Sequence, residues 1–312
     1  MKIYTAIFFY DIKKLTVKFP FRVIRNSFFF LFYAFLPIFA QVLSITGEES
    51  ASSVSTISAV SDPLPQELRL KPIKTYPHDK TSFCQGLVFD TAPDGTRFFY
   101  ESAGKYGHSA IKKAALADGK TLKKTGLKRR YFGEGAALFG GRIYQITWQE
   151  ETCFVYDSET LRQLEQFRYE GEGWGLTENG SELVMSDGSD RIVFRNPKDF
   201  SPIREIRVFW TNRTTGEKEP IPLLNELEWI EGEIWANIYE TTKIVRINPD
   251  TGEAIQILNF SRYIPKECAG DPERVLNGIA WDRTTRHIFI TGKEWPVLYE
   301  LAIENDPAGK VP

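Results

Sequence analysis

A single glutamate lies between two glycines in the stretch Phe132-Gly133-Glu134-Gly135. The apolar run that follows, residues 142–148, predicts a β-strand that ends at Trp148. Glycines leave the backbone free of side-chain bulk, so a ligand can approach it closely. A carboxyl group among aromatic side chains can have a raised pKa, which favours acid/base chemistry. Glu134 is therefore a candidate acid/base residue, and the alternative is a turn glutamate that faces water.

Composition limits the other kinds of chemistry. The chain of 312 residues is long enough for one large domain, and its net charge of −2 gives no reason to expect a nucleic-acid partner. The histidines and cysteines show neither metal-ligand spacing nor a CxxC motif, so we expect no metal site and no cofactor. Three cysteines also allow one disulfide at most. These residues are His78, His108, His287, Cys84, Cys153 and Cys268.

The amino-terminal part carries a targeting pattern. Residues 1–26 are basic, and residues 27–46 form an uncharged apolar run about as long as a bilayer is thick. This predicts a hydrophobic helix that acts as a signal anchor, with residues 1–26 as a cytoplasmic leader. A cleaved signal peptide with Ala40 at the cut site is the close alternative, and a buried core helix is a remote one.

Residues 47–66 are rich in Ser, Ala, Thr, Glu and Pro, which predicts a disordered stalk. We expect the main domain, residues 67–304, to lie in the secretory lumen as a type II membrane protein, or to be secreted, with residues 305–312 as a tail. In either case three sequons become candidate glycosylation sites. They are Asn179, Asn212 and Asn259.

From Arg69 onward the chain consists of short β-type runs separated by Gly, Asp, Asn and Pro. Five segments share a start of small or polar residues followed by apolar ones, and their marker positions are 49, 40, 52 and 51 residues apart. The markers are Gly86, Gly135, Gly175, Leu227 and Gly278. Units of this length with several strands each predict an all-β fold, a five-bladed β-propeller, with a β-sandwich as the alternative. The last unit lacks a fourth strand, which residues 69–76 could supply, closing the ring.

In a propeller, the starts of the innermost strands and the ends of the second strands meet at one mouth. The first group contains Gln85, Glu134, Trp174, Asn225 and Asn277. The second group contains Trp148, Asp187, Asn237 and Lys293, with Phe83 and Phe132 just upstream of the first strands. Together they predict an apolar pocket with a few polar groups, the usual form of a small-ligand site.

Nine short motifs in this order resemble the glutaminyl-peptide cyclotransferases of the plant and bacterial type, over residues 76–301. The motifs are FCQGL (83–87), ESAGKYG (101–107), FGEG (132–135), QITW (145–148), GWGLT (173–177), MSDGS (185–189), LNELE (224–228), LNGIA (276–280) and TGKEWP (291–296). The resemblance implies a five-bladed propeller that converts an amino-terminal glutamine of a peptide or protein into pyroglutamate and releases ammonia.

The resemblance also implies roles for the pocket residues. Glu134 matches the family's acid/base glutamate, and Gln85 and Asn225 match its amide positions. Lys293 is a candidate to stabilise the oxyanion, although a nearby lysine would lower the pKa of Glu134. The aromatic residues would hold the flat substrate amide. They are Phe83, Phe132, Trp148, Trp174 and Tyr239.

Two positions depart from the family pattern. Cys84 stands where threonine is common, and Tyr239 stands where tryptophan is usual. We expect a changed substrate preference, and sensitivity of Cys84 to thiol reagents. Glu226 and Glu228 are the alternative catalysts if Glu134 is not the acid/base residue.

Two other functions compete with this prediction. One is a non-catalytic propeller that binds peptide ends or glycans. The other is a lactonase-like hydrolase with a calcium ring, for which the mouth offers only Glu134, Asp187 and Glu226 as charged ligands. We expect a monomer whose partners are peptides with amino-terminal glutamine and, if the anchor is uncleaved, a membrane.

Overall fold

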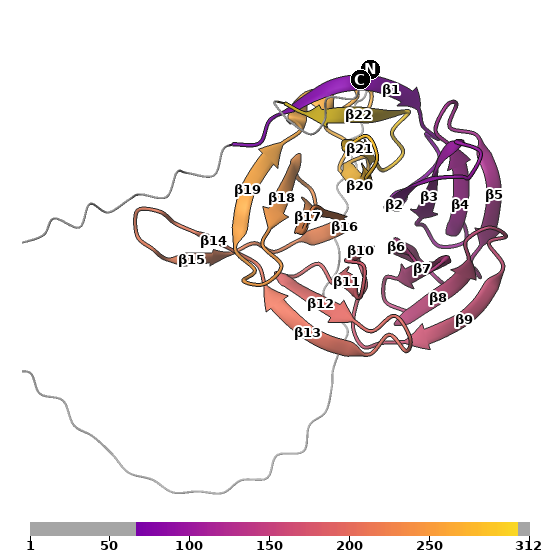
Figure 1. The fold of residues 1–312 in the computed structure, drawn as a ribbon, viewed down its shortest axis with the longest axis horizontal. Coiled ribbons are helices and arrows are strands. Elements are labelled where there is room, and N and C mark those ends of the chain that lie inside the picture. The colour runs from indigo at the N-terminus through magenta and orange to yellow at the C-terminus, as the bar shows by residue number, and fades with distance from the viewer. Residues whose placement is uncertain (1–66, 305–312) are drawn as a thin grey trace, which may run out of the picture. The chain divides into compact units, whose positions relative to one another are not determined.

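The computed structural model describes residues 67–304, and these residues form a five-bladed β-propeller (Figure 1). Each blade is a four-stranded antiparallel sheet. Blade 1 contains β2 (Cys84–Thr91), β3 (Arg97–Ala103), β4 (Ala110–Ala115) and β5 (Thr121–Gly126). Blade 2 contains β6 (Gly133–Phe139), β7 (Arg142–Thr147), β8 (Thr152–Asp157) and β9 (Gln163–Arg168). Blade 3 contains β10 (Leu176–Glu178), β11 (Leu183–Ser186), β12 (Arg191–Arg195) and β13 (Pro202–Arg207). Blade 4 contains β16 (Leu224–Ile230), β17 (Glu233–Ile238), β18 (Lys243–Ile247) and β19 (Ala254–Asn259).

Blade 5 closes the ring as the sequence predicts. Its strands run in the order β1 (Leu70–Pro77), β22 (Val297–Ile303), β21 (His287–Gly292) and β20 (Leu276–Asp282). The first and last strands pair antiparallel, from Leu70 opposite Ile303 to Pro77 opposite Val297. This pairing covers the edge that blade 5 would otherwise leave open.

Two smaller elements lie outside the blades. The hairpin of β14 (Phe209–Thr211) and β15 (Lys218–Pro220) projects from the ring between blades 3 and 4 (Figure 1). A 3-10 helix, η1 (Ser261–Tyr263), follows blade 4. The sequence analysis predicts neither of them.

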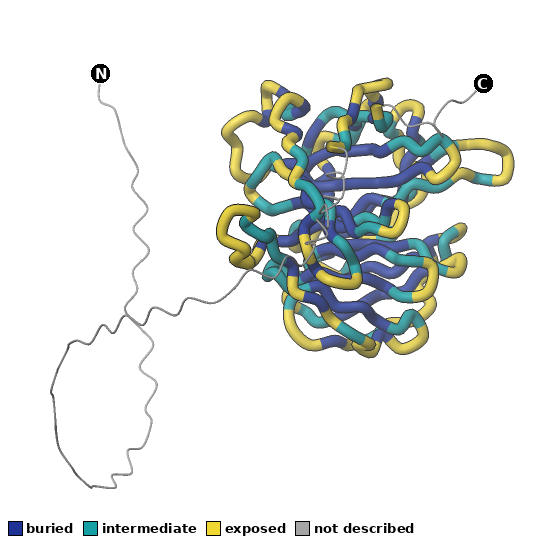
Figure 2. Tube along the Cα trace, turned by 60° about the vertical axis from the view of Figure 1, so that its left-hand side comes forward, coloured by how far each residue is buried: buried dark blue, intermediate teal, exposed yellow. Residues whose placement is uncertain are grey.

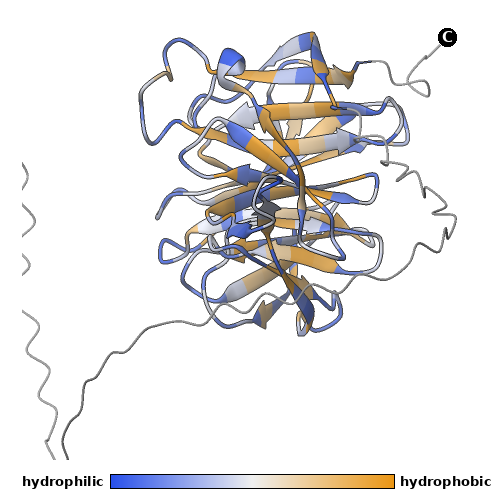
Figure 3. Ribbon diagram, turned by 90° about the vertical axis from the view of Figure 1, so that its left-hand side faces the viewer, coloured by the Kyte–Doolittle hydropathy of each residue, from blue (hydrophilic) through white to orange (hydrophobic). Residues whose placement is uncertain are grey.

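The hydrophobic core lies between neighbouring blades. Phe98 and Tyr100 of blade 1 pack with Ile143 and Phe154 of blade 2 in one buried cluster. Burying an aromatic or branched side chain of this size contributes about 1.5–3 kcal/mol. The inner strands of the blades are correspondingly buried and apolar, whereas the loops at both ends of the blades are largely exposed and polar (Figures 2 and 3). The outermost strand β5 is almost wholly exposed, as expected for an edge.

The innermost strands pack against one another where they carry glycine. A Cβ on Gly135 would lie well inside 3.0 Å of the Leu176 backbone nitrogen, and one on Gly175 equally close to the Asn225 carbonyl. No larger residue fits this contact without moving the backbone. One marker position of the repeat is thereby corrected. In blade 4 the residue equivalent to these glycines is Glu226, not Leu227, because a bulge separates Leu224 from Leu227 in the β16–β17 register.

The same bulge recurs in other innermost strands. The register skips between Cys84 and Gly86, between Gly133 and Ala136, and between Leu276 and Ile279. A bulge re-aims the side chains beside it. The bulged residues include Gln85, Glu134, Asn225 and Asn277.

The segments predicted for residues 1–26, 27–46, 47–66 and 305–312 lie outside the described residues. Within residues 67–304 no helix is long and apolar enough to cross a membrane.

Candidate active site

A cavity of about 250 Å³ opens at the mouth where the innermost strands begin. Its lining contains every residue that the sequence analysis assigns to substrate or catalysis, and one residue that it does not, Glu273. The lining residues are Phe83, Gln85, Phe132, Glu134, Trp148, Trp174, Asn225, Tyr239, Glu273 and Lys293. The structure thus brings together side chains from all five blades.

Glu134 is the buried carboxyl group of this cavity, with 5% of its surface exposed. Its Oε1 accepts a hydrogen bond of 2.9 Å from Nε2 of Gln85. Burial raises the pKa of Glu134 well above its ordinary value. Lys293 opposes this rise, the carboxylates of Glu150 and Glu172 add to it, and the Gln85 hydrogen bond again opposes it. The pKa of Glu134 is therefore raised despite the nearby Lys293, because the effect of burial is larger than that of the lysine.

Lys293 follows β21 and is 3% exposed. Its Nζ lies 4.8 Å from the ring centroid of Phe83 and 4.4 Å from that of Tyr239. Burial lowers the pKa of Lys293, and the charge of Glu134 opposes the decrease. No carboxylate in residues 67–304 forms an ion pair with this ammonium. The two rings therefore hold it by cation–π attraction.

The aromatic walls are ordered by edge-to-face contacts. Phe132 lies 6.2 Å from Phe83 and 5.8 Å from Trp148, and Trp174 lies 5.4 Å from Tyr239, measured between ring centroids. Such pairs add about 0.5–1.5 kcal/mol beyond the burial of their area. The rings therefore form stiff walls around the carboxyl group.

Glu172 orients two of these walls, and the sequence analysis misses it. Its Oε2 accepts the indole N–H groups of Trp148 (2.8 Å) and Trp174 (3.0 Å), and its Oε1 accepts from Gln149 (3.0 Å). Burial tends to raise the pKa of Glu172, but these hydrogen bonds outweigh it and lower the pKa. The only sequence signal is an acidic residue two positions before Trp174.

Asn225 lines the cavity and carries an unused acceptor. The residue is 2% exposed, and its Oδ1 has no hydrogen-bond partner within the described chain. A buried carbonyl oxygen without a partner is costly, so the position favours a ligand that donates a hydrogen bond.

Three residues predicted at the mouth do not line the cavity. Asp187 forms an ion pair of 2.9 Å with Arg191. Asn237 and Asn277 are fully buried behind the lining.

Glu226 and Glu228 lie deeper, and each already has partners for both oxygens. Glu226 accepts from the backbone nitrogens of Leu87 and Ile279. Glu228 accepts from Thr177 and the backbone of Trp281, and it lines a larger hollow of about 320 Å³ at the opposite ends of the innermost strands. Burial raises the pKa of Glu228 to about 8. Because both oxygens are occupied, this hollow is less suited to proton transfer than the cavity around Glu134.

The expected thiol sensitivity of Cys84 does not fit the structure. Cys84 is fully buried in the core between blades 1 and 5, and burial raises the pKa of its thiol well above the ordinary value. A reagent reaches neither the sulfur nor a thiolate. All three cysteines are free thiols.

The candidate glycosylation sites differ in environment. Asn259 is exposed at the end of β19, whereas Asn179 and Asn212 are half-buried and donate through Nδ2 to Glu182 and Glu219. Within residues 67–304 no group of three His, Cys, Asp or Glu side chains could hold a metal ion.

Known proteins resemble this chain along most of its length. A glutaminyl-peptide cyclotransferase of Arabidopsis thaliana is 30% identical over 300 residues, covering 95% of this chain and 86% of its own. The crystal structure of the Myxococcus xanthus glutaminyl cyclase is 33% identical and superposes with a TM-score of 0.67, covering 76% of this chain and 97% of its own. The profile of the glutamine cyclotransferase family matches residues 42–303, and this chain belongs to that family.

Proposed function

We propose that this protein converts the amino-terminal glutamine of peptides into pyroglutamate and releases ammonia. Family membership and the two relatives named for this activity support the proposal. The observation that carries it is Glu134, a buried carboxyl group with a raised pKa at the wall of a cavity that also holds Lys293.

The cavity suits one terminal residue rather than a long peptide. Its 250 Å³ is below the range of about 300–1,000 Å³ typical of drug-sized ligands. The aromatic walls would hold the planar side-chain amide of glutamine. The free Oδ1 of Asn225 would accept a hydrogen bond from a substrate N–H group.

Ring closure joins the substrate α-amine nitrogen to its own side-chain amide carbon. Both groups belong to one molecule, so much of the entropic cost is already met. The α-ammonium has a pKa of about 7.7–8.0 and must lose a proton before it attacks. A carboxylate whose own pKa is raised takes this proton more readily than an ordinary one, which fits Glu134.

The attack gives a tetrahedral centre with a developing oxyanion. The ammonium of Lys293, shielded from water between two rings, would stabilise that charge. Glu134 then returns its proton to the amide nitrogen, the C–N bond breaks, ammonia leaves and the ring carbonyl re-forms. The ring nitrogen still carries one surplus proton, which passes to the departing ammonia, so the products are the neutral lactam and ammonium. Glu134 ends the cycle as it began, ionised.

The deciding experiment measures ammonia release from a dipeptide that begins with glutamine. Glu134→Gln should fold normally and lose about 10²–10⁴-fold in turnover, the usual share of acid/base catalysis. Glu228→Gln, the matched change in the opposite hollow, should retain turnover. No release by the folded wild-type protein would instead support a module that binds peptide ends, and chelator-sensitive ester cleavage would support a lactonase.

We further propose that residues 67–304 lie in the secretory lumen or outside the cell. The apolar run of residues 27–46 and the exposed sequon at Asn259 support this location. A shift in gel mobility after glycosidase treatment, absent in Asn259→Gln, would test it; an unshifted protein recovered from the cytosol would refute it.

A further inference from the structure

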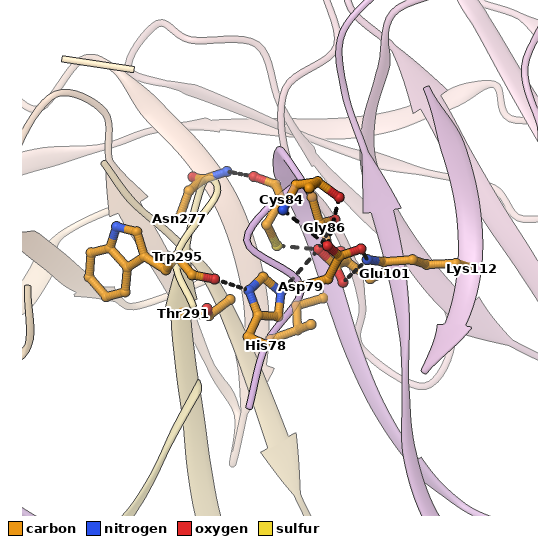
Figure 4. Close-up of polar contacts among 12 residues, drawn as sticks. His78, Asp79, Cys84, Gly86, Glu101, Lys112, Asn277, Thr291 and Trp295 are labelled. Carbon is orange, nitrogen blue, oxygen red and sulfur yellow. Dashed lines mark hydrogen bonds and ion pairs between the residues drawn. The ribbon is translucent and has the colours of Figure 1, made fainter. Parts of the chain in front are cut away.

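A chain of buried polar contacts runs from the backbone to Glu134. Nδ2 of Asn277 donates to the carbonyl oxygen of Cys84 (2.9 Å) and to Oε1 of Gln85 (3.0 Å). Nε2 of Gln85 donates in turn to Oε1 of Glu134 (2.9 Å). Exposed fractions of 0%, 4% and 5% for Asn277, Gln85 and Glu134 leave no bulk water to replace these bonds. Figure 4 shows the Asn277 amide directed at Cys84.

The backbone fixes the direction of every bond in this chain. A carbonyl oxygen only accepts, so Asn277 must turn its NH2 group, and not its oxygen, toward Cys84. The same NH2 group then meets the oxygen of the Gln85 amide. Gln85 has its oxygen on one side and its nitrogen on the other, so its nitrogen must face Glu134.

The Cys84 carbonyl group is held in place by the strand, so it cannot turn away from Asn277 and allow these hydrogen bonds to reverse. Cys84 opens β2, its own N–H bonds to Ser82, and it lies opposite Ala103 in the ladder. Asn277 is left with its Oδ1 buried and without a partner in the described chain. The unpartnered Oδ1 of Asn277 is less unfavourable than the flipped amide, which would place this oxygen against the carbonyl oxygen of Cys84.

The two oxygens of Glu134 thereby become different. Oε1 always receives a donor, so a proton on Glu134 is carried by Oε2. Within residues 67–304 Oε2 has no hydrogen-bond partner, and Glu134 lines the cavity. The proton therefore resides on the oxygen that is free for substrate.

We propose that Asn277 is a positioning residue that, by holding the Gln85 amide in one orientation, keeps the exchangeable proton of Glu134 on the oxygen that faces the cavity. The inference rests on the proposed function and adds to it a residue that does not touch substrate.

The test is the isosteric change Asn277→Asp. At a pH at which the introduced carboxyl group is ionised, it has no donor, and it attracts Nε2 of Gln85. The Gln85 amide then turns its oxygen toward Glu134, and only a protonated Glu134 can donate to that oxygen. The acid limb of kcat/KM against pH should move up by about one unit, the size expected for a lost hydrogen bond to a charged group. At a pH below this limb, kcat/KM should fall about tenfold.

The same change in a Gln85→Met protein separates an effect through the Gln85 amide from a direct effect of charge. Methionine forms neither hydrogen bond of the Gln85 amide, so adding Asn277→Asp to Gln85→Met should not move the acid limb. A shift of equal size in that background would overturn the proposal, because the new carboxylate would then act through space. Asn237→Asp is the matched control, since Asn237 is equally buried, binds the Gly278 N–H through Oδ1 and forms no hydrogen bond with Gln85. It should shift the limb less.

Where turnover is too slow, the 13C signal of the Glu134 carboxyl carbon in glutamate-labelled protein reports the same pKa, assigned by its loss in Glu134→Gln. If Asn277→Asp does not fold, Asn277→Ser replaces it and should move the limb in the same direction. An active wild type with an unmoved limb in a folded variant refutes only this inference. An inactive wild type refutes the proposed function.

Discussion

Trp148 and Trp174 belong to neighbouring blades, yet both donate their indole N–H groups to the same carboxylate oxygen of Glu172. One charged group outside the cavity therefore sets the angle of two of its walls. The same charge raises the pKa of Glu134. Position and proton affinity at the site are thus coupled through Glu172.

Replacing Glu172 should separate these two effects. Glu172→Ala removes both indole bonds, and we expect a 10–100-fold loss of kcat/KM, since bonds to charged groups contribute about 1.5–3 kcal/mol. Glu172→Gln keeps an acceptor oxygen but removes the charge. The pKa of Glu134 should then fall, and the acid limb of kcat/KM should move to lower pH. Glu170→Ala, an exposed change in the same loop, is the control for both; an effect of equal size there would contradict the assignment.

Lys293→Met should damage both the chemistry and the pH profile. Loss of an oxyanion donor typically costs about 10²–10³-fold in kcat. Lys293 also lowers the pKa of Glu134 against the effect of burial, so its removal should raise that pKa and move the acid limb upward. Lys105→Met is the matched control, because Lys105 also lies over the Phe83 ring, at 4.6 Å, but does not line the cavity. Unchanged kcat in Lys293→Met would remove the lysine from the mechanism.

Gly175→Ala should destabilise the ring and disturb the site together. Its Cβ would meet the Asn225 carbonyl, and overpacking of this kind costs about 1–3 kcal/mol. The free energy of unfolding, from urea titration, should fall by that amount, and KM should rise as Asn225 moves. Gly126→Ala adds a methyl group with no atom within 4 Å, and we expect a change within about 0.5 kcal/mol. Equal stability of the two variants would show that the blades can separate at Gly175.

The contact between blades 1 and 5 should make stability depend on pH. His78 bonds to the Trp295 carbonyl (2.7 Å) and to Glu101 (3.2 Å), which also pairs with Lys112 (3.1 Å) (Figure 4). Burial alone would lower the pKa of His78, but Glu101 outweighs burial and raises it. A raised pKa in the folded state stabilises the protein below the ordinary histidine value, about 6.5, and this contribution is lost as the pH rises through the folded-state pKa.

The measurement is the free energy of unfolding at pH 6 and at pH 9. Wild type should lose stability between them, and His78→Gln should lose less. His108→Gln, an exposed change in the loop between β3 and β4, should behave as wild type. A His78→Gln protein with the full wild-type decrease would place the titrating group elsewhere.

Much of the ring is predictable because its signal is periodic. Residues such as Gly135 and Gly175 recur where blades touch, and the missing fourth strand of the last unit identifies β1 as its partner. The sequence indicates Glu134 as a candidate acid/base residue for a local reason, since glycines flank it and aromatic residues lie nearby in sequence.

The remaining features depend on side-chain direction, which periodicity does not contain. Glu172 is one acid among many until the indoles of Trp148 and Trp174 are seen to converge on it. The repeat pattern does not reveal the role of Glu226, because this charged residue takes the position that glycine has in other blades. Its carboxylate binds two backbone N–H groups of other blades. Cys84 is adjacent to a site residue in sequence, yet its side chain points into the core.

The pairing of β1 with β22 has a consequence for biosynthesis. At a translation rate of about 5–20 residues per second, β1 leaves the ribosome tens of seconds before the strand that it pairs with exists. Lys293 is made just before β22, so a nascent chain holds Glu134 long before it holds the ammonium group of Lys293. Ring closure and the assembly of the cavity around Glu134 therefore coincide, and unfinished chains should be catalytically silent.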